Sequence, residues 1–191
     1  MDYKNLNGNS LKIIEALNEK KHYFNELHEK TGIRSKNNLL RNLNSLTQNG
    51  ILIKEKNKSN TFYSINYSNS IAIALLNLIN NIKFSGLPYN IRTGILESIF
   101  ALKPKIAILF GSYVKGNYKK ESDVDLLFFE SEDNLKERVR EISKSYGIKL
   151  NITLMNLKEL NLKSEPMMHI FKTGYPLVGE NYFYNELKKE I

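Results

Sequence analysis

The sequence predicts an α+β protein built from two compact modules. Within about the first 70 residues, three stretches of helical periodicity are followed by a short hairpin pattern. The second half holds two apolar runs that flank a polar loop, as expected for strands of a buried sheet. A chain of 191 residues is long for one domain but suits two modules of below about 120 residues each. We expect modules at 1–70 and 91–191, with a connecting helix and linker at 71–90.

Composition narrows the function classes. The formal charge of +8 and the pI near 9.4 favour a polyanionic partner, such as DNA, RNA or a nucleotide. Lys, Asn and Ile are abundant throughout, however, and an AT-rich genome alone could produce this bias. The chain has no cysteine, which excludes disulfides, zinc–thiolate sites and cysteine nucleophiles.

No feature of the sequence indicates a membrane. No apolar run reaches the roughly 18 residues that a membrane-spanning helix needs. The segment Met1 to Ser10 is polar and does not resemble a signal peptide. We therefore expect a soluble, cytoplasmic protein.

The first module is predicted to contain three helices and two strands. Its helices have apolar residues three to four apart, and glycines at positions 32 and 50 can end the second and third. Ser10 is the expected N-cap of the first helix. The predicted helices span 10–20, 23–30 and 35–49, and the predicted strands span 51–55 and 61–66, with a polar tip at 56–60.

Three helices followed by a hairpin resemble the winged helix-turn-helix family. The resemblance implies that the third helix enters the DNA major groove and that the hairpin forms the wing. Arg and Asn can make bidentate contacts to bases, whereas Lys mostly meets phosphate. The candidate DNA-binding residues are Arg34, Lys36, Asn37, Asn38 and Arg41 on and before the helix, and Lys56 and Lys58 on the wing. A solvated helix face is the alternative for each of them, and winged helices also serve as protein-docking modules.

Two further helices are expected after the hairpin. The apolar stretch Ile71 to Ile82 is long enough for about three turns, and 83–90 contains the Gly86 and Pro88 of a linker. A helix at 91–102 should end before Pro104.

The pattern that carries chemistry lies between two apolar strands. The first run, Ile106 to Phe110, ends in Gly111-Ser112, and the second run follows Asp123-Val124-Asp125. Residues two apart in a strand point to the same face, so the two carboxylates should lie side by side. Adjacent carboxylates repel unless a cation lies between them, and a hard divalent ion such as Mg²⁺ suits such ligands.

The loop between glycine and aspartates can contact phosphate. Gly111 would let the backbone approach a phosphate closely, and the Ser112 hydroxyl and nearby amides can donate hydrogen bonds to its oxygens. Lys115 could neutralise a triphosphate, although a charged loop is usually just solvated. Tyr113 and Tyr118 could stack on a base. The three histidines lack ligand spacing, so no zinc site is expected.

This pattern resembles the motif of the minimal nucleotidyltransferases of the DNA polymerase beta superfamily. It consists of Gly-Ser, ten further residues and Asp-x-Asp, and it lies between two apolar strands. The resemblance covers roughly Lys105 to Gly179 and implies a domain with a small mixed sheet. It also implies that Gly111 and Ser112 hold a nucleoside triphosphate. Asp123 and Asp125 would bind two Mg²⁺ (or Mn²⁺) ions and act as catalytic residues. The alternative is a surface aspartate pair that caps a strand.

One position departs from that family pattern. A third carboxylate is expected on the next strand, and here the matching residue of the predicted strand 149–156 is Asn151. An asparagine oxygen can ligate Mg²⁺, but it cannot act as a base and it removes one negative charge. Glu97, Glu121 and Glu130 are possible replacements. Nucleotide binding without turnover is therefore an open alternative to catalysis.

Three hypotheses follow. The first is an enzyme that transfers a nucleoside monophosphate to a hydroxyl on protein, RNA or a small molecule. The second is a regulator that binds double-stranded DNA and whose degenerate nucleotidyltransferase domain senses nucleotide or mediates assembly. The third, by family analogy, is one component of a toxin–antitoxin pair that modifies a partner protein or tRNA. A homodimer would suit a winged helix that reads a two-fold site.

Overall fold

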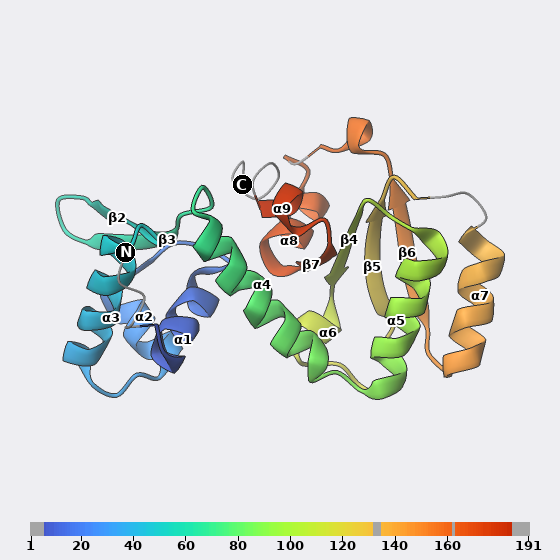
Figure 1. The fold of residues 1–191 in the computed structure, drawn as a ribbon, viewed down its shortest axis with the longest axis horizontal. Helices are drawn as coiled ribbons and strands as arrows, with labels where there is room; N and C mark the ends of the chain where they lie inside the picture. Colours follow the sequence, from blue (N-terminus) through green and yellow to red (C-terminus); the bar gives the residue numbers. More distant parts are fainter. Residues whose placement is uncertain (1–5, 132–134, 162, 185–191) are drawn as a thin grey trace. The chain divides into compact units, whose positions relative to one another are not determined.

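The computed structural model describes residues 6–131, 135–161 and 163–184. The chain divides into two compact units, residues 1–79 and 80–191 (Figure 1). Among the described residues, no helix is both long and apolar enough to cross a membrane. The first unit contains α1 (Gly8–Leu17), β1 (His22–Tyr23), α2 (Phe24–Thr31), α3 (Lys36–Gln48), β2 (Leu52–Lys56), β3 (Thr61–Ile65) and the start of α4 (Ser70–Ser85).

The three helices of the first unit form where the periodicity indicates them, but the start of α1 differs from the prediction. Asn7 is the N-cap, and its side chain accepts hydrogen bonds from the backbone amides of Asn9 and Ser10. Ser10 lies one turn inside the helix and completes the capping box through the amide of Asn7. The Asn7 side chain satisfies two amides that Ser10 cannot reach, which explains the earlier start.

A three-stranded antiparallel sheet completes the first unit. Its order is β1-β3-β2, and the hairpin of β2 and β3 is in the predicted place. The two-residue strand β1 was not expected, because its length carries no periodicity. The helices and the sheet enclose a core that is almost completely shielded from solvent. Its helical members include Ile13, Ile14, Leu17, Leu27, Leu39, Leu43 and Leu46.

The connection between α4 and the next helix is shorter than the predicted linker. Helix α4 continues to Ser85, and α5 (Tyr89–Leu102) starts with Pro88 as its N-cap. The loop is thus 86–88 rather than 83–90, because Lys83 and Phe84 continue the helix up to Gly86. Helix α5 ends at Leu102, and its C-cap Lys103 directly precedes Pro104, as expected.

The second unit is built around a mixed four-stranded sheet. After α5 the elements are β4 (Ile106–Phe110), α6 (Ser112–Lys115), β5 (Val124–Phe129), α7 (Leu135–Tyr146), β6 (Leu150–Met155), the 3-10 turn η2 (Leu157–Glu159), α8 (Glu165–Thr173), β7 (Tyr175–Val178) and α9 (Glu180–Tyr182). The strand order is β6-β5-β4-β7, with β5 and β6 parallel and the other pairs antiparallel.

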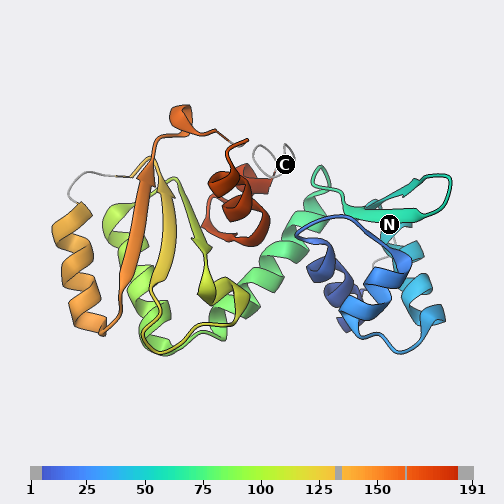
Figure 2. The same ribbon diagram turned by 180° about the vertical axis from the view of Figure 1, so that it is seen from behind.

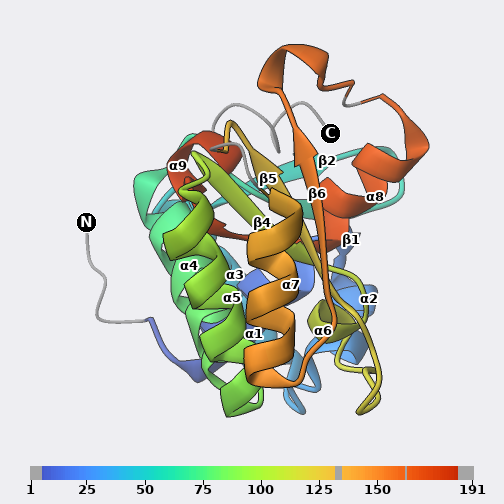
Figure 3. The ribbon, with the colours of Figure 1, turned by 90° about the vertical axis from the view of Figure 1, so that its right-hand side faces the viewer.

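Helices cover both faces of this sheet. Helices α5 and α7 lie side by side on one face, and α8 and α9 lie on the other (Figures 2 and 3). The α5 face contacts Val124, Leu126 and Phe128. On the opposite face, Phe129 contacts Phe171 of α8. The continuous apolar run of β5 is therefore explained by burial on both faces.

Candidate functional site

The strand register brings three predicted site residues together at one end of the sheet. Phe110, the last residue of β4, pairs with Asp125, and Asp125 pairs with Asn151 of β6. Gly111 directly follows Phe110 and is the N-cap of α6. Residues about 40 positions apart in the sequence thus become neighbours across adjacent strands.

Gly111 has a conformation and a surrounding that require glycine. Its φ of 78° and ψ of −148° lie in a region that is essentially restricted to glycine. A Cβ atom added here would collide with the carboxylate of Asp125. The expected role of Gly111 was close approach to a phosphate. The structure adds that this glycine makes the space in which the Asp125 side chain lies.

The two aspartates lie at the start of β5. Asp123 directly precedes the first strand residue, Val124, and its side chain is exposed, whereas Asp125 is half-buried. Val124 and Leu126 are completely buried on the other face, as the alternation predicts. The Lys149 ammonium lies 3.9 Å from Asp123 Oδ1, in a solvent-exposed pair that is weak.

Asn151 contacts Asp125 directly. Its amide nitrogen Nδ2 donates a hydrogen bond of 2.8 Å to Asp125 Oδ1. A charge-assisted bond of this length fixes the orientation of the carboxylate and occupies one of its lone pairs. Asn151, which stands where a third carboxylate was expected, therefore holds the Asp125 carboxylate in place.

Lys115 has a partner that the sequence did not indicate. It is the last residue of α6, and its ammonium lies 3.3 Å from Nε2 of His169 on α8. The two residues are 54 positions apart, and His169 belongs to no recognisable motif. Only the packing of α8 on the sheet brings this histidine beside the loop that follows Gly111.

The two loop tyrosines stack on each other. The rings of Tyr113 and Tyr118 are 4.4 Å apart and inclined by 15°. The Tyr113 hydroxyl donates to the carbonyl of Ser122, directly before Asp123. Burial raises the pKa of Tyr113, and the nearby Tyr118 and Asp123 raise it further. This tyrosine pair therefore ties α6 to the loop that leads into the aspartates.

Comparison with known proteins identifies the segment that contains these residues. Residues 95–182 match the family model described as "Polymerase beta, Nucleotidyltransferase". Residues 95–182 form a nucleotidyltransferase domain of the polymerase beta type. The predicted resemblance is thereby confirmed for this segment.

Relatives of the nucleotidyltransferase domain occur in Methanocaldococcus jannaschii. "Putative protein adenylyltransferase MJ1305" is 33% identical over 94 residues, which cover 43% of this chain and 64% of that protein. "Putative protein adenylyltransferase MJ0141" is 43% identical over 58 residues, which cover 28% of this chain and 59% of that protein. The chain thus spans less than two thirds of the length of each curated relative.

A solved structure also shows similarity to part of the chain. It is titled "Crystal structure of the toxin-antitoxin with AMP-PNP". Its sequence identity is 19% and its TM-score is 0.38, and the match covers 51% of this chain and 84% of that one. A TM-score this low establishes no common fold or function.

The polar residues of the nucleotidyltransferase domain fit a divalent cation. Carboxylate and amide oxygens, together with substrate phosphates and water, are the ligands that Mg²⁺ prefers. Asp123 and Asp125 supply the carboxylates. Asn151 directs its nitrogen at Asp125, so its oxygen could become a ligand only if the amide turned. Within the described part of the chain, no three His, Cys, Asp or Glu side chains cluster as a metal site.

The possible replacements for a third carboxylate lie elsewhere. Glu130 follows the far end of β5, and its Oε1 accepts a hydrogen bond from the Leu157 amide. Glu121 is exposed in the loop before the aspartates, and Glu97 lies on α5. The strand register places Asn151, and none of these three glutamates, directly beside Asp125.

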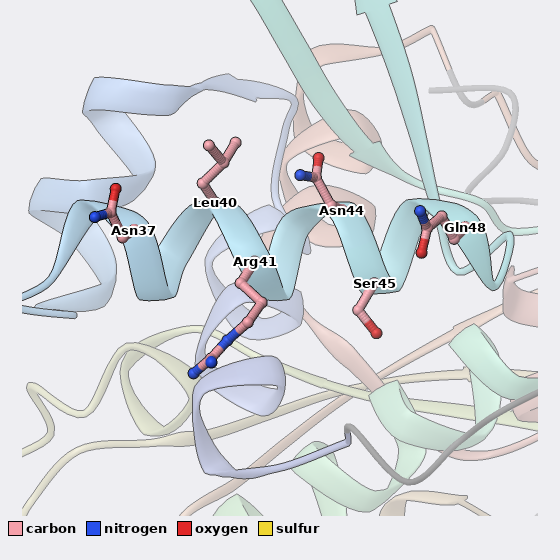
Figure 4. Close-up of a pocket in the computed structure, with 6 residues that line it drawn as sticks. All are labelled: Asn37, Leu40, Arg41, Asn44, Ser45 and Gln48. Atoms are coloured by element: carbon pink, nitrogen blue, oxygen red, sulfur yellow. The ribbon is translucent and has the colours of Figure 1, made fainter.

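In the first unit, the predicted DNA-binding residues lie on and beside α3 and on the hairpin. Arg34, Lys36 and Asn37 are exposed at the start of α3. The side-chain oxygen of Asn38 is already bonded within the helix, because it accepts hydrogen bonds from Asn42 and from Arg41. The two wing candidates, Lys56 and Lys58, are exposed at the hairpin tip. Figure 4 shows the outward side of α3, which carries further polar side chains.

Proposed function

We propose that the chain transfers a nucleoside monophosphate from a nucleoside triphosphate to a hydroxyl acceptor and releases pyrophosphate, with Mg²⁺ or Mn²⁺ as cofactor. The observation that carries this proposal is the contact of Gly111, Asp125 and Asn151 at the end of three adjacent strands. The family of the domain supports the reaction class.

Each residue has a defined part in this proposal. The Gly111 and Ser112 backbone and the Ser112 hydroxyl donate hydrogen bonds to phosphate oxygens, and Lys115 adds a positive charge. Asp123 and Asp125 hold the divalent cation, and Asn151 keeps the Asp125 carboxylate in one orientation. When bound, the cation neutralises phosphate charge and lowers the pKa of the acceptor hydroxyl.

The names of the relatives from Methanocaldococcus jannaschii suggest which substrates to test first. Because they are named as protein adenylyltransferases, ATP and a protein side-chain hydroxyl are the first donor and acceptor to examine. RNA and small-molecule hydroxyls are the other acceptor classes.

The test uses each of the four α-³²P-labelled nucleoside triphosphates with Mg²⁺ or Mn²⁺ and a cell extract as a source of acceptors. We expect label transfer that disappears with EDTA and in the double variant Asp123→Asn, Asp125→Asn. Glu137→Gln, which removes an exposed carboxylate from α7, serves as the matched control and should transfer label normally. Transfer that survives in the double variant would contradict the proposed roles of the aspartates.

A second candidate function is regulation through DNA. The order α1-β1-α2-α3-β2-β3 and the hairpin lysines support a winged helix in the first unit. Residues 1–79 contain 11 Lys and Arg but six Asp and Glu, which gives +5 of the total charge of +8. In this case the second unit binds nucleotide without turnover, which the missing third carboxylate would explain. Titration of duplex DNA at several salt concentrations tests this function, because phosphate contacts make the affinity fall with salt.

A further inference from the structure

The outward side of α3 forms a polar stripe with one apolar member. The stripe residues recur three or four positions apart, so they share one side of the helix. They line a surface pocket of about 370 Å³ (Figure 4). The stripe consists of Asn37, Leu40, Arg41, Asn44, Ser45 and Gln48.

The helix that carries this stripe is firmly supported from behind. Leu39 and Leu43 are completely buried in the core of the unit. Asn42 is buried as well: its Nδ2 donates to the Asn38 carbonyl, and its Oδ1 accepts a hydrogen bond of 3.2 Å from the Ser10 hydroxyl of α1. Buried polar bonds of this kind fix the rotation of α3 about its axis, so the stripe faces outward in one orientation.

The chemistry of the stripe matches a base edge better than a protein surface. Asn and Gln amides pair bidentately with adenine N6 and N7, and an apolar side chain contacts the thymine methyl group. Leu40, which is 42% exposed, is the only apolar stripe residue, whereas the centres of protein interfaces are rich in apolar and aromatic residues. Helix α3 contains no Asp or Glu that would repel phosphate.

The dimensions also fit a groove. From Asn37 to Gln48 the helix rises by about 16 Å at 1.5 Å per residue. That length corresponds to roughly five base-pair steps of 3.4 Å. The major groove of B-DNA is wide enough to admit a helix.

We propose that α3 reads A·T base pairs in the major groove, with Asn44 and Gln48 bonded to adenines and Leu40 against thymine methyl groups. The proposal rests on the DNA-binding function considered above and adds its sequence preference. None of these three residues was predicted from the sequence as a DNA contact. Asn37, at the start of the stripe, contributes a third amide.

Arg41 has a different part from the amides. Its guanidinium points away from the Leu40 and Asn44 side chains in Figure 4, at the flank of the stripe, and its Nη2 donates to Asn38 Oδ1. From this flank it contacts the phosphate backbone. Arg41→Ala should therefore weaken binding to all duplexes alike and reduce the slope of log affinity against log salt by about one.

The first experiment selects duplexes from a random pool with the full-length chain. We expect selected sites that contain adjacent A·T pairs. Two base analogues then separate direct contact from recognition of DNA shape. Replacing adenine by 7-deazaadenine removes the N7 acceptor, and replacing thymine by uracil removes the methyl group. The first change should weaken binding about tenfold at one position, since a bidentate pair contributes about that much discrimination.

Variants assign the contacts to residues. Asn44→Ala and Gln48→Ala should lose the response to 7-deazaadenine, and Leu40→Ala should lose the response to uracil. Asn25→Ala removes an exposed amide from α2 and is the matched control, which should retain both responses. Circular dichroism checks that each variant is folded.

The outcomes separate the two proposals. Salt-dependent binding without base preference, or a preference that neither analogue changes, overturns A·T readout by α3 but leaves DNA binding intact. No binding to any duplex at low salt overturns both DNA binding and its readout. Neither outcome affects the nucleotidyl-transfer assay, which measures the second unit.

Discussion

The hydrogen bond from Asn151 to Asp125 lets an uncharged amide orient a charged carboxylate. A carboxylate in the place of Asn151 would repel Asp125, whereas the amide attracts it. This hydrogen bond holds Asp125 in position in the absence of a cation. Asparagine in place of a carboxylate at position 151 also leaves one fewer negative charge to attract a divalent cation.

This trade-off predicts the effect of Asn151→Asp. Without a divalent ion the variant should melt at a lower temperature than the wild type, because three carboxylates then converge. Added Mg²⁺ should raise its melting temperature more than that of the wild type, and transfer should accelerate by about 10²-fold, the lower range for general-base catalysis. Thermal melts over a Mg²⁺ series test this. Asn151→Ala, which loses the bond without gaining a charge, should show no such added response to Mg²⁺.

Gly111→Ala should damage both stability and the site. The backbone conformation alone costs on the order of 1–3 kcal/mol with a side chain, and the added methyl group displaces the Asp125 carboxylate. Gly147→Ala is the matched control, because its φ is also positive at 61° but the position of its Cβ is open. Urea unfolding should show a loss in both variants. Only Gly111→Ala should lose Mg²⁺ affinity, and equal affinities would refute the role of Gly111.

At the scale of elements, the short helix α6 positions the aspartate loop through Tyr113. Its ring stacks on Tyr118 while its hydroxyl bonds to the Ser122 carbonyl. A four-residue helix has little stability of its own, so these side-chain contacts provide most of the restraint. The geometry of Asp123 therefore depends on a tyrosine ten residues earlier in the chain.

Tyr113→Phe should loosen this loop without emptying the core. Loss of one hydrogen bond costs about 0.5–1.5 kcal/mol, and a more mobile Asp123 should bind Mg²⁺ less tightly. Urea unfolding and Mg²⁺ titration provide the measurements. Tyr118→Phe keeps the stacked ring pair and should change neither quantity, so identical behaviour of the two variants would disprove the role of the Tyr113 hydroxyl.

The elements differ in how well local sequence predicts them. The run Ile106 to Phe110 and the Asp-x-Asp pattern placed β4 and β5 correctly, because burial and alternation are local signals. The cap of α1 was misplaced by three residues, since Asn7 and Ser10 are both good caps. The contact of Lys115 with His169 and the direction of the Asn151 amide arise from packing between distant segments, which no local pattern records.

At the scale of the whole molecule, each of the two units contains a tyrosine whose hydroxyl pKa is raised by burial. Tyr67 lies in the first unit, where its hydroxyl donates to the Asn18 carbonyl, and Tyr175 lies in the second. Burial raises the pKa of both hydroxyls above the ordinary value near 10. As the pH rises, these tyrosines therefore ionise at a lower pH in the unfolded chain than in the folded protein.

Both units should therefore lose stability in alkali. The stabilising contribution of a raised tyrosine pKa is complete below about pH 10 and is lost as the pH rises above that value. Urea unfolding followed at pH 8 and pH 11 should show the decrease. Tyr67→Phe should lessen it for the first unit and Tyr175→Phe for the second. A decrease that is equally steep in both variants and the wild type would assign the alkaline effect to other groups.

The parallel pairing of β5 with β6 also has a consequence for synthesis of the chain. Parallel strands need a crossover, and here α7 must be made before Asn151 can reach Asp125. Contacts between distant segments form late in folding because the intervening loop must first be closed. A nascent chain still on the ribosome therefore carries the Gly-Ser and Asp-x-Asp segments well before they are aligned. The proposed nucleotide site should therefore be complete only after β6 has left the exit tunnel and joined the sheet.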